Sequence, residues 1–531
     1  MELIKKQIHM NRWKGKTVTQ ITLDEDFIVP DTLEDMEQVI LDTARILGEN
    51  GTIQDEKMTV KGKMEFAVLY RKEDGGLETL GGNIPFEETV NVPGFTEGDN
   101  TTASWILEDM KAEMINSRKL GVQAVITVEI RGEGEENAYA ASEVKIPGTA
   151  GNMETEKEGE DAPEIKNGII SPMTMVLHRK DTYRIRENMD VTGGRPDIAR
   201  LLWKELHIGN PTVKPLEGRL YLEGQLNVFV IYETEEENMP VQWMEEVLPF
   251  SGDIELSQAH EGQIPMVSVR LAHGEVEVKP DADGQMRELD VDAVLELDIR
   301  LYEEKEETLI QDMYSNSRKL IPQTETIQYD RLIAKNVCKP RIGEKIHLGQ
   351  SERILQICHT QGSIQLDEAE PQENGLLIEG ILDVTILYLT SDDKAPIRSV
   401  SRQIPFKCSA QAAGITKNSI YQLDAGLEQL SALMTGNDTV EIKAVAALDF
   451  MILEPVMETV ITGVKEEPLD LKALQVIPGI AGYIVQEDDS LWDIAKKFHT
   501  TMGNIITTND LPGEQIKAGQ RLLLVKEVGM I

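Results

Sequence analysis

The chain has 531 residues, of which 53 are basic and 93 acidic, so its formal net charge is −40. That length is too great for a single hydrophobic core and predicts several domains. The negative charge would repel nucleic acid phosphates and anionic lipid headgroups, so we expect no nucleic acid partner.

The amino-terminal residues MELIKKQIHMNRWKGK carry positive charge, but no apolar run follows them, so they do not resemble a secretory signal. No stretch has the length of a membrane-spanning helix, and we expect no membrane insertion. The three cysteines, Cys338, Cys358 and Cys408, are widely spaced and form no CxxC pair. This pattern favours three reduced thiols in a cytoplasmic protein over a zinc site or a disulfide framework.

Three segments, each placed upstream of a strand pattern, have the residue pattern of a short helix or turn. They are PDTLEDMEQVI (30–40), PDIARLLWKEL (196–206) and SERILQICHTQ (351–361). Each is followed by an alternating apolar run in which a glycine precedes a tyrosine by eight residues. The glycines are Gly62, Gly224 and Gly380, and the tyrosines are Tyr70, Tyr232 and Tyr388. The period of two predicts a strand with one buried face.

A second element of each repeat contains a Pro-Phe pair, in NIPFEE (83–88), VLPFSG (247–252) and QIPFKC (403–408). Proline is tolerated at the start of a strand or on a sheet edge, so we expect it in one of these two positions. Strand, loop and strand together predict a long hairpin. Each repeat closes with a further alternating run. These runs cover residues 121–130, 289–302 and 440–450.

The unit recurs about every 150 to 160 residues, a period that favours duplicated domains over a solenoid. The acidic stretch TEKEGEDAPE (155–164) has too few apolar residues to form a core and predicts a linker. The expected bounds are 1–150, 169–320 and 321–465 for three β-rich repeats, 151–168 for the linker and 481–528 for a carboxy-terminal module.

Catalytic signatures are absent from the sequence: it contains no GxxxxGK[ST], GxSxG, HExxH or GxGxxG motif. The eight histidines are dispersed, and His207 and His359 are interpreted as hydrogen-bonded or surface residues. The acidic clusters at 233–238 and 303–307 lack the ligand spacing and the glycine of a calcium loop and are interpreted as solvated hairpin tips. We therefore expect no enzyme activity and no catalytic, cofactor or metal site.

The carboxy-terminal module, which contains YIVQEDDSLWDIAKKFHTTMGNI from Tyr483, has a different pattern. Asp489 or Ser490 is expected to cap a helix, with Asp493 completing a capping box. Leu491, Ile494, Ala495 and Phe498 then fall on one helical face. TMGNIITTN predicts a second helix and IKAGQRLLLVK a turn and closing strand, so the expected order is β-α-α-β.

This module resembles the LysM family in YIVQ, DSLWDIAKKF, the following TT, NDL and IKAGQRL. The resemblance implies that glycans containing N-acetylglucosamine bind between two loops, Asp488 to Leu491 and Asn509 to Ile516. Asp488 stands where the family usually has glycine, so we weigh glycan binding against protein contact. The candidate binding residues are Asp488, Asp489, Ser490, Leu491, Trp492, Asn509, Asp510, Leu511 and Ile516.

The repeats, their Gly-x8-Tyr and Pro-Phe elements and the terminal LysM module together resemble the SPOCS-domain spore coat proteins. That resemblance implies a mainly β, multidomain fold that ends in a small α+β LysM domain. It also implies a non-enzymatic scaffold in the mother-cell cytoplasm that docks on the forespore surface. The implied partner of LysM is the stage IV sporulation ATPase of the coat basement layer, with other coat proteins as further partners.

Two alternatives stay open at this point. A secreted protein that binds or cleaves cell-wall peptidoglycan would explain the LysM module, but it would need an export signal. A phage tail or baseplate component can carry a terminal LysM module without one. Genomic neighbourhood and expression timing would distinguish these alternatives from a coat scaffold.

Overall fold

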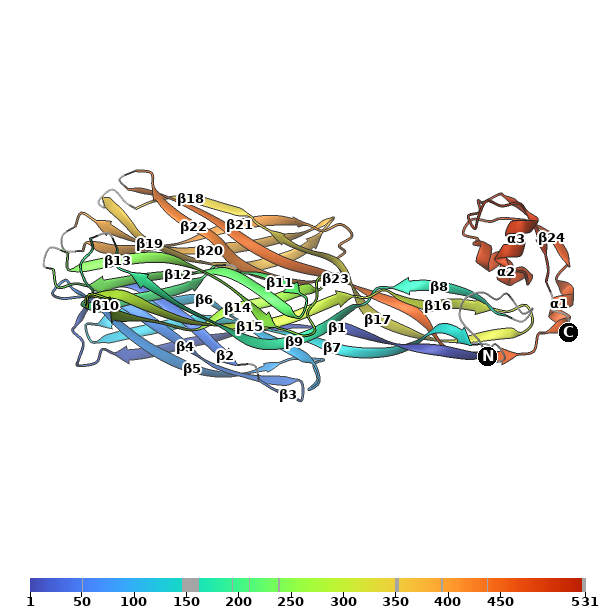
Figure 1. Cartoon of the computed structure of the whole chain (residues 1–531), viewed down its shortest axis with the longest axis horizontal. Helices are drawn as coiled ribbons and strands as arrows, with labels where there is room; N and C mark the ends of the chain where they lie inside the picture. Colours follow the sequence, from blue (N-terminus) through green and yellow to red (C-terminus); the bar gives the residue numbers. More distant parts are fainter. Residues whose placement is uncertain are drawn as a thin grey trace.

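The protein has a wide β-rich body, a narrow stalk and a small helical module beside the tip of the stalk, as seen in the computed structural model (Figure 1). The amino terminus lies at the stalk tip. The expected mainly β, multidomain fold with a small α+β module is confirmed. The structure describes residues 1–527 except 50, 146–161, 193, 210, 237–238, 349–352, 393–394 and 437.

The first repeat consists of two antiparallel sheets. In one sheet β4 pairs with β5 on one side and with β2 and β3 on the other, and in the second sheet β7 lies between β1 and β6. Apolar side chains from both sheets form one buried cluster, so the core lies between the sheets. The bounds are β1 (Glu2–Ile28), β2 (Met36–Glu49), β3 (Ile53–Gln54), β4 (Lys57–Lys72), β5 (Leu77–Asn91), β6 (Asn100–Asn116) and β7 (Lys119–Lys145).

The second repeat has the same arrangement, with an additional ribbon. Strand β12 pairs with β10, β11 and β13, while β15 lies between β14 and β9, and β8 pairs with β16. Its core again lies between the two larger sheets. The bounds are β8 (Glu164–Ile170), β9 (Met173–Asp190), β10 (Arg200–Ile208), β11 (Thr212–Leu216), β12 (Arg219–Glu233), β13 (Val241–Glu255), β14 (Ile264–Pro280), β15 (Met286–Glu304) and β16 (Glu307–Tyr314).

In the third repeat β20 lies between β19 and β21, and β23 pairs with β17, β18 and β22. One buried cluster joins the two sheets. The bounds are β17 (Lys319–Cys338), β18 (Arg341–His347), β19 (Ile354–Gln372), β20 (Gly375–Thr390), β21 (Ile397–Gln411), β22 (Ile420–Met434) and β23 (Thr439–Glu467).

The two repeated sequence motifs lie opposite each other in every repeat. The predicted hairpins are β4–β5, β12–β13 and β20–β21, and in each the motif glycine pairs directly with the phenylalanine of the Pro-Phe element. Because glycine has no side chain, the aromatic ring of the phenylalanine can lie over the glycine backbone and cover it. In the described part of each sheet the proline lies on an edge strand, which is one of the two predicted positions, and not at the start of a strand. The pairs are Gly62 with Phe86, Gly224 with Phe250 and Gly380 with Phe406.

The segments expected to be helices or turns are strands instead, so that prediction is wrong. Residues 36–40, 200–206 and 354–361 belong to β2, β10 and β19. Each strand has a β-bulge next to the residue that pairs with the motif tyrosine of the neighbouring strand. A bulge inserts one extra residue, which breaks the alternation of apolar residues. The shifted pattern therefore imitates a helix. The bulged residues are Ile40, Leu202 and Cys358, and the tyrosines beside them are the buried Tyr70, Tyr232 and Tyr388.

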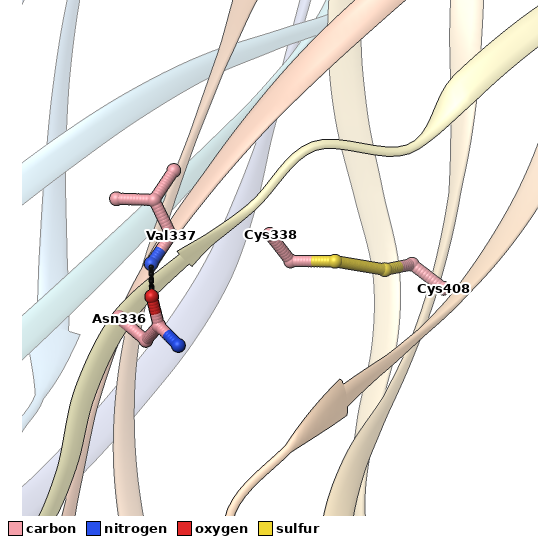
Figure 2. Close-up of a disulfide and its surroundings, with 4 residues drawn as sticks. All are labelled: Asn336, Val337, Cys338 and Cys408. Atoms are coloured by element: carbon pink, nitrogen blue, oxygen red, sulfur yellow. Dashed lines mark hydrogen bonds between the residues drawn. A yellow bond between two sulfur atoms is a disulfide. The ribbon is translucent and has the colours of Figure 1, made fainter.

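The cysteines also differ from the expectation of three reduced thiols. Cys338 at the end of β17 and Cys408 in β21 form a disulfide that joins the two sheets of the third repeat (Figure 2). The two residues are separated by 70 positions in the sequence, and only the packing of the two sheets brings them together. Cys358 is free and buried.

The stalk is built from three antiparallel ribbons, one from each repeat: the amino-terminal part of β1 with the end of β7, β8 with β16, and β17 with the end of β23 (Figure 1). Their inward side chains form shared apolar clusters. One cluster contains Ile8, Met10, Ala140, Ile170, Leu309, Ile327, Tyr329 and Val460. Residues 151–161 of the expected linker lie outside the described residues, and residues 164–168 belong to β8.

The three repeats also meet in the body. Residues at and beside the bulges of β2, β10 and β19 form one apolar cluster that all three repeats share. The first repeat contributes Ile40 and Leu41 to it, the second Trp203 and the third Cys358. Nearer the stalk, one buried polar residue from each repeat meets its counterparts. The Tyr302 hydroxyl donates to both oxygens of Glu133, at 2.9 and 3.0 Å, and Gln422 Nε2 donates to Glu133 Oε1 at 2.7 Å. The repeats therefore share buried contacts at both ends of the body.

Candidate functional site

The carboxy-terminal module has the predicted β-α-α-β order. After α1 (Leu471–Val476) come β24 (Ile480–Ile484), α2 (Leu491–Phe498), α3 (Met502–Thr508) and β25 (Arg521–Val525), and β24 pairs antiparallel with β25. Ser490 is the N-cap of α2 and accepts from the Asp493 backbone N–H, as the capping box predicts. Leu491, Ile494 and Ala495 are buried, so the expected helical stripe forms the core of the module.

The first candidate loop keeps a backbone shape that favours glycine. Asp488 has φ +71°, in the left-handed region where a side chain is unfavourable. Its exposed carboxylate therefore occupies a position with a glycine-like backbone. The next residue, Asp489, accepts hydrogen bonds from the Tyr483 hydroxyl at 2.8 Å and from the Gln486 backbone N–H at 2.7 Å. These hydrogen bonds fix the loop.

The second candidate loop is fixed by Asn509. Its side-chain amide donates to the carbonyls of Ile505 and Leu523, each at 2.8 Å, and its Oδ1 accepts from the Leu523 N–H at 2.6 Å. Asn509 thus ties the end of α3 to β25 and has a structural role in the module. Asp510, with φ +51°, is exposed.

The nine candidate residues divide into two groups. Leu491 and Trp492 are 3% and 4% exposed, and Leu511 and Ile516 are half-buried against the same apolar cluster. The two loops therefore share one core. Because Leu491 and Trp492 are buried within the chain, the surface available to a partner consists of the remaining residues, with Leu511 and Ile516 as its apolar members.

Trp492 packs against the stalk rather than against solvent. Its ring meets that of Tyr314 on β16 edge to face, with centroids 4.9 Å apart, and its Nε1 donates to Asp312 Oδ2 at 2.8 Å. Lys496 forms an ion pair with the same carboxylate at 2.8 Å. The Tyr314 hydroxyl donates to the Thr500 carbonyl at 2.9 Å. One face of α2 is thus docked on β16 of the second repeat.

Electrostatics supports this docking. Burial by itself raises the pKa of Asp312, but hydrogen bonds from Lys496 and Trp492 outweigh it, so the pKa lies below the usual carboxyl value. The sequence pattern gave no sign of this contact, because Asp312 and Tyr314 lie about 180 residues before their partners. In the sequence, the alternation of apolar and polar residues in LIQDMY around Asp312 and Tyr314 indicates only a strand.

Within the described residues, no group of three or more His, Cys, Asp or Glu side chains is placed to hold a metal ion. The helices in the described part of the chain are too short or too polar to span a bilayer.

The matches to family models agree with this order of domains. A model described as the SipL SPOCS domain matches residues 35–115, 197–279 and 353–435, and a LysM domain model matches residues 483–525. The chain therefore has a SipL-like architecture. It contains three SPOCS domains followed by one LysM domain, as the sequence motifs indicated. No curated protein and no solved structure matches the chain.

The matched domains define the class of protein. SPOCS and LysM domains are binding and scaffold domains, and the chain is a sporulation-associated protein that carries a LysM domain. The SPOCS matches begin at or just before the bulged strands β2, β10 and β19, and they end in or beside β6, β14 and β22. The stalk ribbons of β8–β16 and the ends of β1 and β23 lie outside those matches.

We predict that Asp312→Ala loosens the LysM domain from the stalk. The substitution leaves the Trp492 N–H and the Lys496 ammonium without their shared acceptor, a loss of about 1–3 kcal/mol. Amide hydrogen exchange in α2 should become faster, while exchange in β4 should not change. The control is Lys517→Ala, which alters an exposed lysine of the same domain. Unchanged protection of α2 in Asp312→Ala would show that the docking contributes no stability.

Proposed function

We propose that the chain is a non-enzymatic scaffold of the endospore coat that works in the mother-cell cytoplasm at the forespore surface. Its SPOCS domains form one continuous body, and its LysM domain is held at the far end of the stalk. Such an arrangement separates a large assembly surface from a small recognition domain. The single observation that carries the proposal is the combination of three SPOCS domains with a LysM domain docked by α2, which leaves the two loops on the remaining surface.

We infer that the LysM domain binds a protein, the stage IV sporulation ATPase of the coat basement layer, rather than peptidoglycan. Asp488 places a carboxylate where the backbone favours glycine and where close approach of a sugar would require one. Glu487, next to the first loop, is also exposed, as are Asp510 and Glu514 in the second loop. This negative rim favours a partner surface that carries lysine or arginine around an apolar anchor.

The apolar members of this surface supply the test. Protein interfaces depend on a few anchors, and replacing one costs about 2 kcal/mol or more, which is roughly thirtyfold in affinity. We expect Leu511→Asp and Ile516→Asp each to abolish retention of the coat ATPase in a pull-down with the full chain. Amide hydrogen exchange in α2 and α3 of each variant verifies that the two helices persist.

Val476→Asp is the matched control, because it makes the same kind of change at an apolar residue that is 81% exposed outside the two loops. It should retain the ATPase. Sedimentation with purified peptidoglycan should pellet neither the wild type nor the variants. Saturable peptidoglycan binding, with the ATPase absent from the pull-down, would favour the wall-binding alternative; Asp488→Gly should then strengthen that binding.

A further inference from the structure

Within the described residues, the sheet of the LysM domain consists of β24 and β25, so each strand has one outer edge. Asn509 covers the outer edge of β25, because its side chain bonds the N–H and the carbonyl of Leu523 at 2.6 and 2.8 Å. The backbone groups along an open strand edge favour pairing with another strand, and proteins usually protect them. The asparagine gives this protection to β25.

The outer edge of β24 has no comparable cover among the described residues. Alternate residues of an antiparallel pair direct their N–H and carbonyl groups toward the partner strand. Val485 bonds to the β25 side through both its N–H and its carbonyl, at 3.0 and 2.8 Å. At the opposite parity, Ile480, Gly482 and Ile484 therefore direct these groups to the outer edge. The described contact there is the Gln486 side-chain amide, which donates to the Ile484 carbonyl at 2.7 Å.

The side chains along this edge are apolar and exposed. Ile480 is 66% exposed and Ile484 is 54% exposed, and Leu523, which pairs with Gly482 on the same face of the sheet, is 47% exposed. A Cβ atom at Gly482 would have no atom of the described residues within 4 Å, so this face is open. None of these residues belongs to the two candidate loops of the domain.

The edge of β24 is complementary to a second copy of itself. Its sequence, IAGYI, is nearly symmetric about Gly482. When two copies pair antiparallel with the two Gly482 residues opposite each other, Ile480 of each copy faces Ile484 of the other. A twofold axis requires this reciprocity. The outward backbone groups then lie opposite each other, as in the residue pairs that exchange two N–H···O bonds.

Charge permits two copies to meet at this edge and opposes contact elsewhere. The sequence has no charged residue between Lys472 and Glu487. Residues 479–527 carry seven acidic and five basic side chains, so they contribute only −2 to the net charge of −40. Strand β24 also lies at the end of the long axis of the molecule, away from the acidic body (Figure 1). Because like charges repel, two copies approach most easily through this end.

We propose that two copies of this chain associate through β24, antiparallel about Gly482, so that their LysM domains share a four-stranded sheet. A pair of five-residue strands is small beside the roughly 800 Å² that each partner buries in a stable complex. The dimer should therefore be weak, with a dissociation constant in the micromolar range. Salt should strengthen it, because salt screens the repulsion between two chains of charge −40.

Sedimentation equilibrium of the full chain, over a roughly hundredfold range of concentration, tests the dimer. We expect a reversible monomer–dimer equilibrium whose dissociation constant falls as sodium chloride is raised. Gly482→Pro removes an N–H from the outer edge but none of the bonds to β25, so it should weaken the dimer about tenfold or more. Ile480→Lys should do the same. Ile169→Lys is the matched control, because Ile169 of the stalk is 63% exposed, and it should dimerise like the wild type.

A charge pair across the axis tests the register. Ile484→Asp alone should weaken the dimer as Ile480→Lys does. Combining the two substitutions in one chain should restore the dimer, because each introduced ammonium then faces an introduced carboxylate of the other copy. Higher salt should weaken this restored dimer.

Three results would overturn the proposal. One is a wild type that stays monomeric at every concentration and salt, which would leave the edge to a strand of a different protein. Another is a dimer that is equally tight in wild type, Gly482→Pro and Ile480→Lys, which would place the contact elsewhere. The third is a double variant that dimerises no better than either single variant.

Discussion

Replacing Phe250 by alanine is expected to lower the free energy of unfolding by about 3–5 kcal/mol, as for other buried aromatic side chains. The ring is 7% exposed and lies over Gly224 in the core of the second SPOCS domain. Loss of the ring removes apolar burial and uncovers Gly224 in the central strand β12. Glycine has no side chain that could fill the space. Urea unfolding followed by circular dichroism measures the change.

A double-mutant cycle tests whether the glycine and the ring act as a unit. A Cβ atom at Gly224 would lie 2.6 Å from Phe250 Cζ, so Gly224→Ala alone should cost about 1–3 kcal/mol through overpacking. Adding Gly224→Ala to Phe250→Ala should cost much less, because the ring is no longer there. Gly98→Ala is the control, since no atom lies within 4 Å of a Cβ at that position. Strictly additive losses would contradict the pairing.

The second large effect concerns pH. We expect the contact between the second and third SPOCS domains to lose about 3 kcal/mol of stability as the pH rises from 6.5 to about 9. His359 of β19 stacks on Phe229 of β12, with ring centroids 3.9 Å apart. Its Nδ1 lies 3.4 Å from Glu245 and its Nε2 lies 3.7 Å from Glu205.

The sign follows from the surroundings of the ring. Burial lowers the pKa of His359, but Glu205 and Glu245 outweigh it and raise the pKa from 6.5 to about 9. Each ring nitrogen faces one of these carboxylates, and hydrogen bonding and charge attraction to them both favour the protonated ring. His207 faces the same site and opposes the protonated form. Since the folded state binds the proton more tightly, this stabilisation is complete below pH 6.5 and is lost as the pH passes about 9.

Urea unfolding at pH 6 and at pH 9.5 measures this contribution. The wild type should lose stability between the two values, whereas His359→Gln should be less stable at pH 6 and should show a flatter dependence. His273→Gln is the control, because His273 is an exposed histidine of the second domain. An identical pH dependence in wild type and His359→Gln would show that the imidazolium is not involved.

Much of the local structure could be predicted because it depends on short-range patterns. Alternation gave the strands β4, β12 and β20, and the Pro-Phe pairs gave their hairpin partners on the sheet edges. The capping box at Ser490 gave the start of α2. The bulged strands β2, β10 and β19 escaped prediction, since one inserted residue beside each tyrosine disrupts the period that identifies a strand.

The candidate site was only partly predictable. The LysM motif placed both loops on one module. Trp492, however, contacts Tyr314 and Asp312 of the stalk, and Asn509 makes hydrogen bonds within the module. A motif indicates which residues are close in sequence order, and it cannot indicate which face of a helix another part of the chain covers.

By itself, the sequence determined the threefold repetition, because the same motifs recur along the chain. It also determined the strand period, the hairpin in each repeat and the terminal LysM domain, because each of these depends on residues within about 50 positions of one another. Only the tertiary structure decided the three-ribbon stalk, the disulfide between Cys338 and Cys408 and the meeting of Glu133 with Tyr302 and Gln422. These contacts join residues 70 to nearly 300 positions apart, and at that separation packing between sheets, rather than any local pattern, brings side chains together.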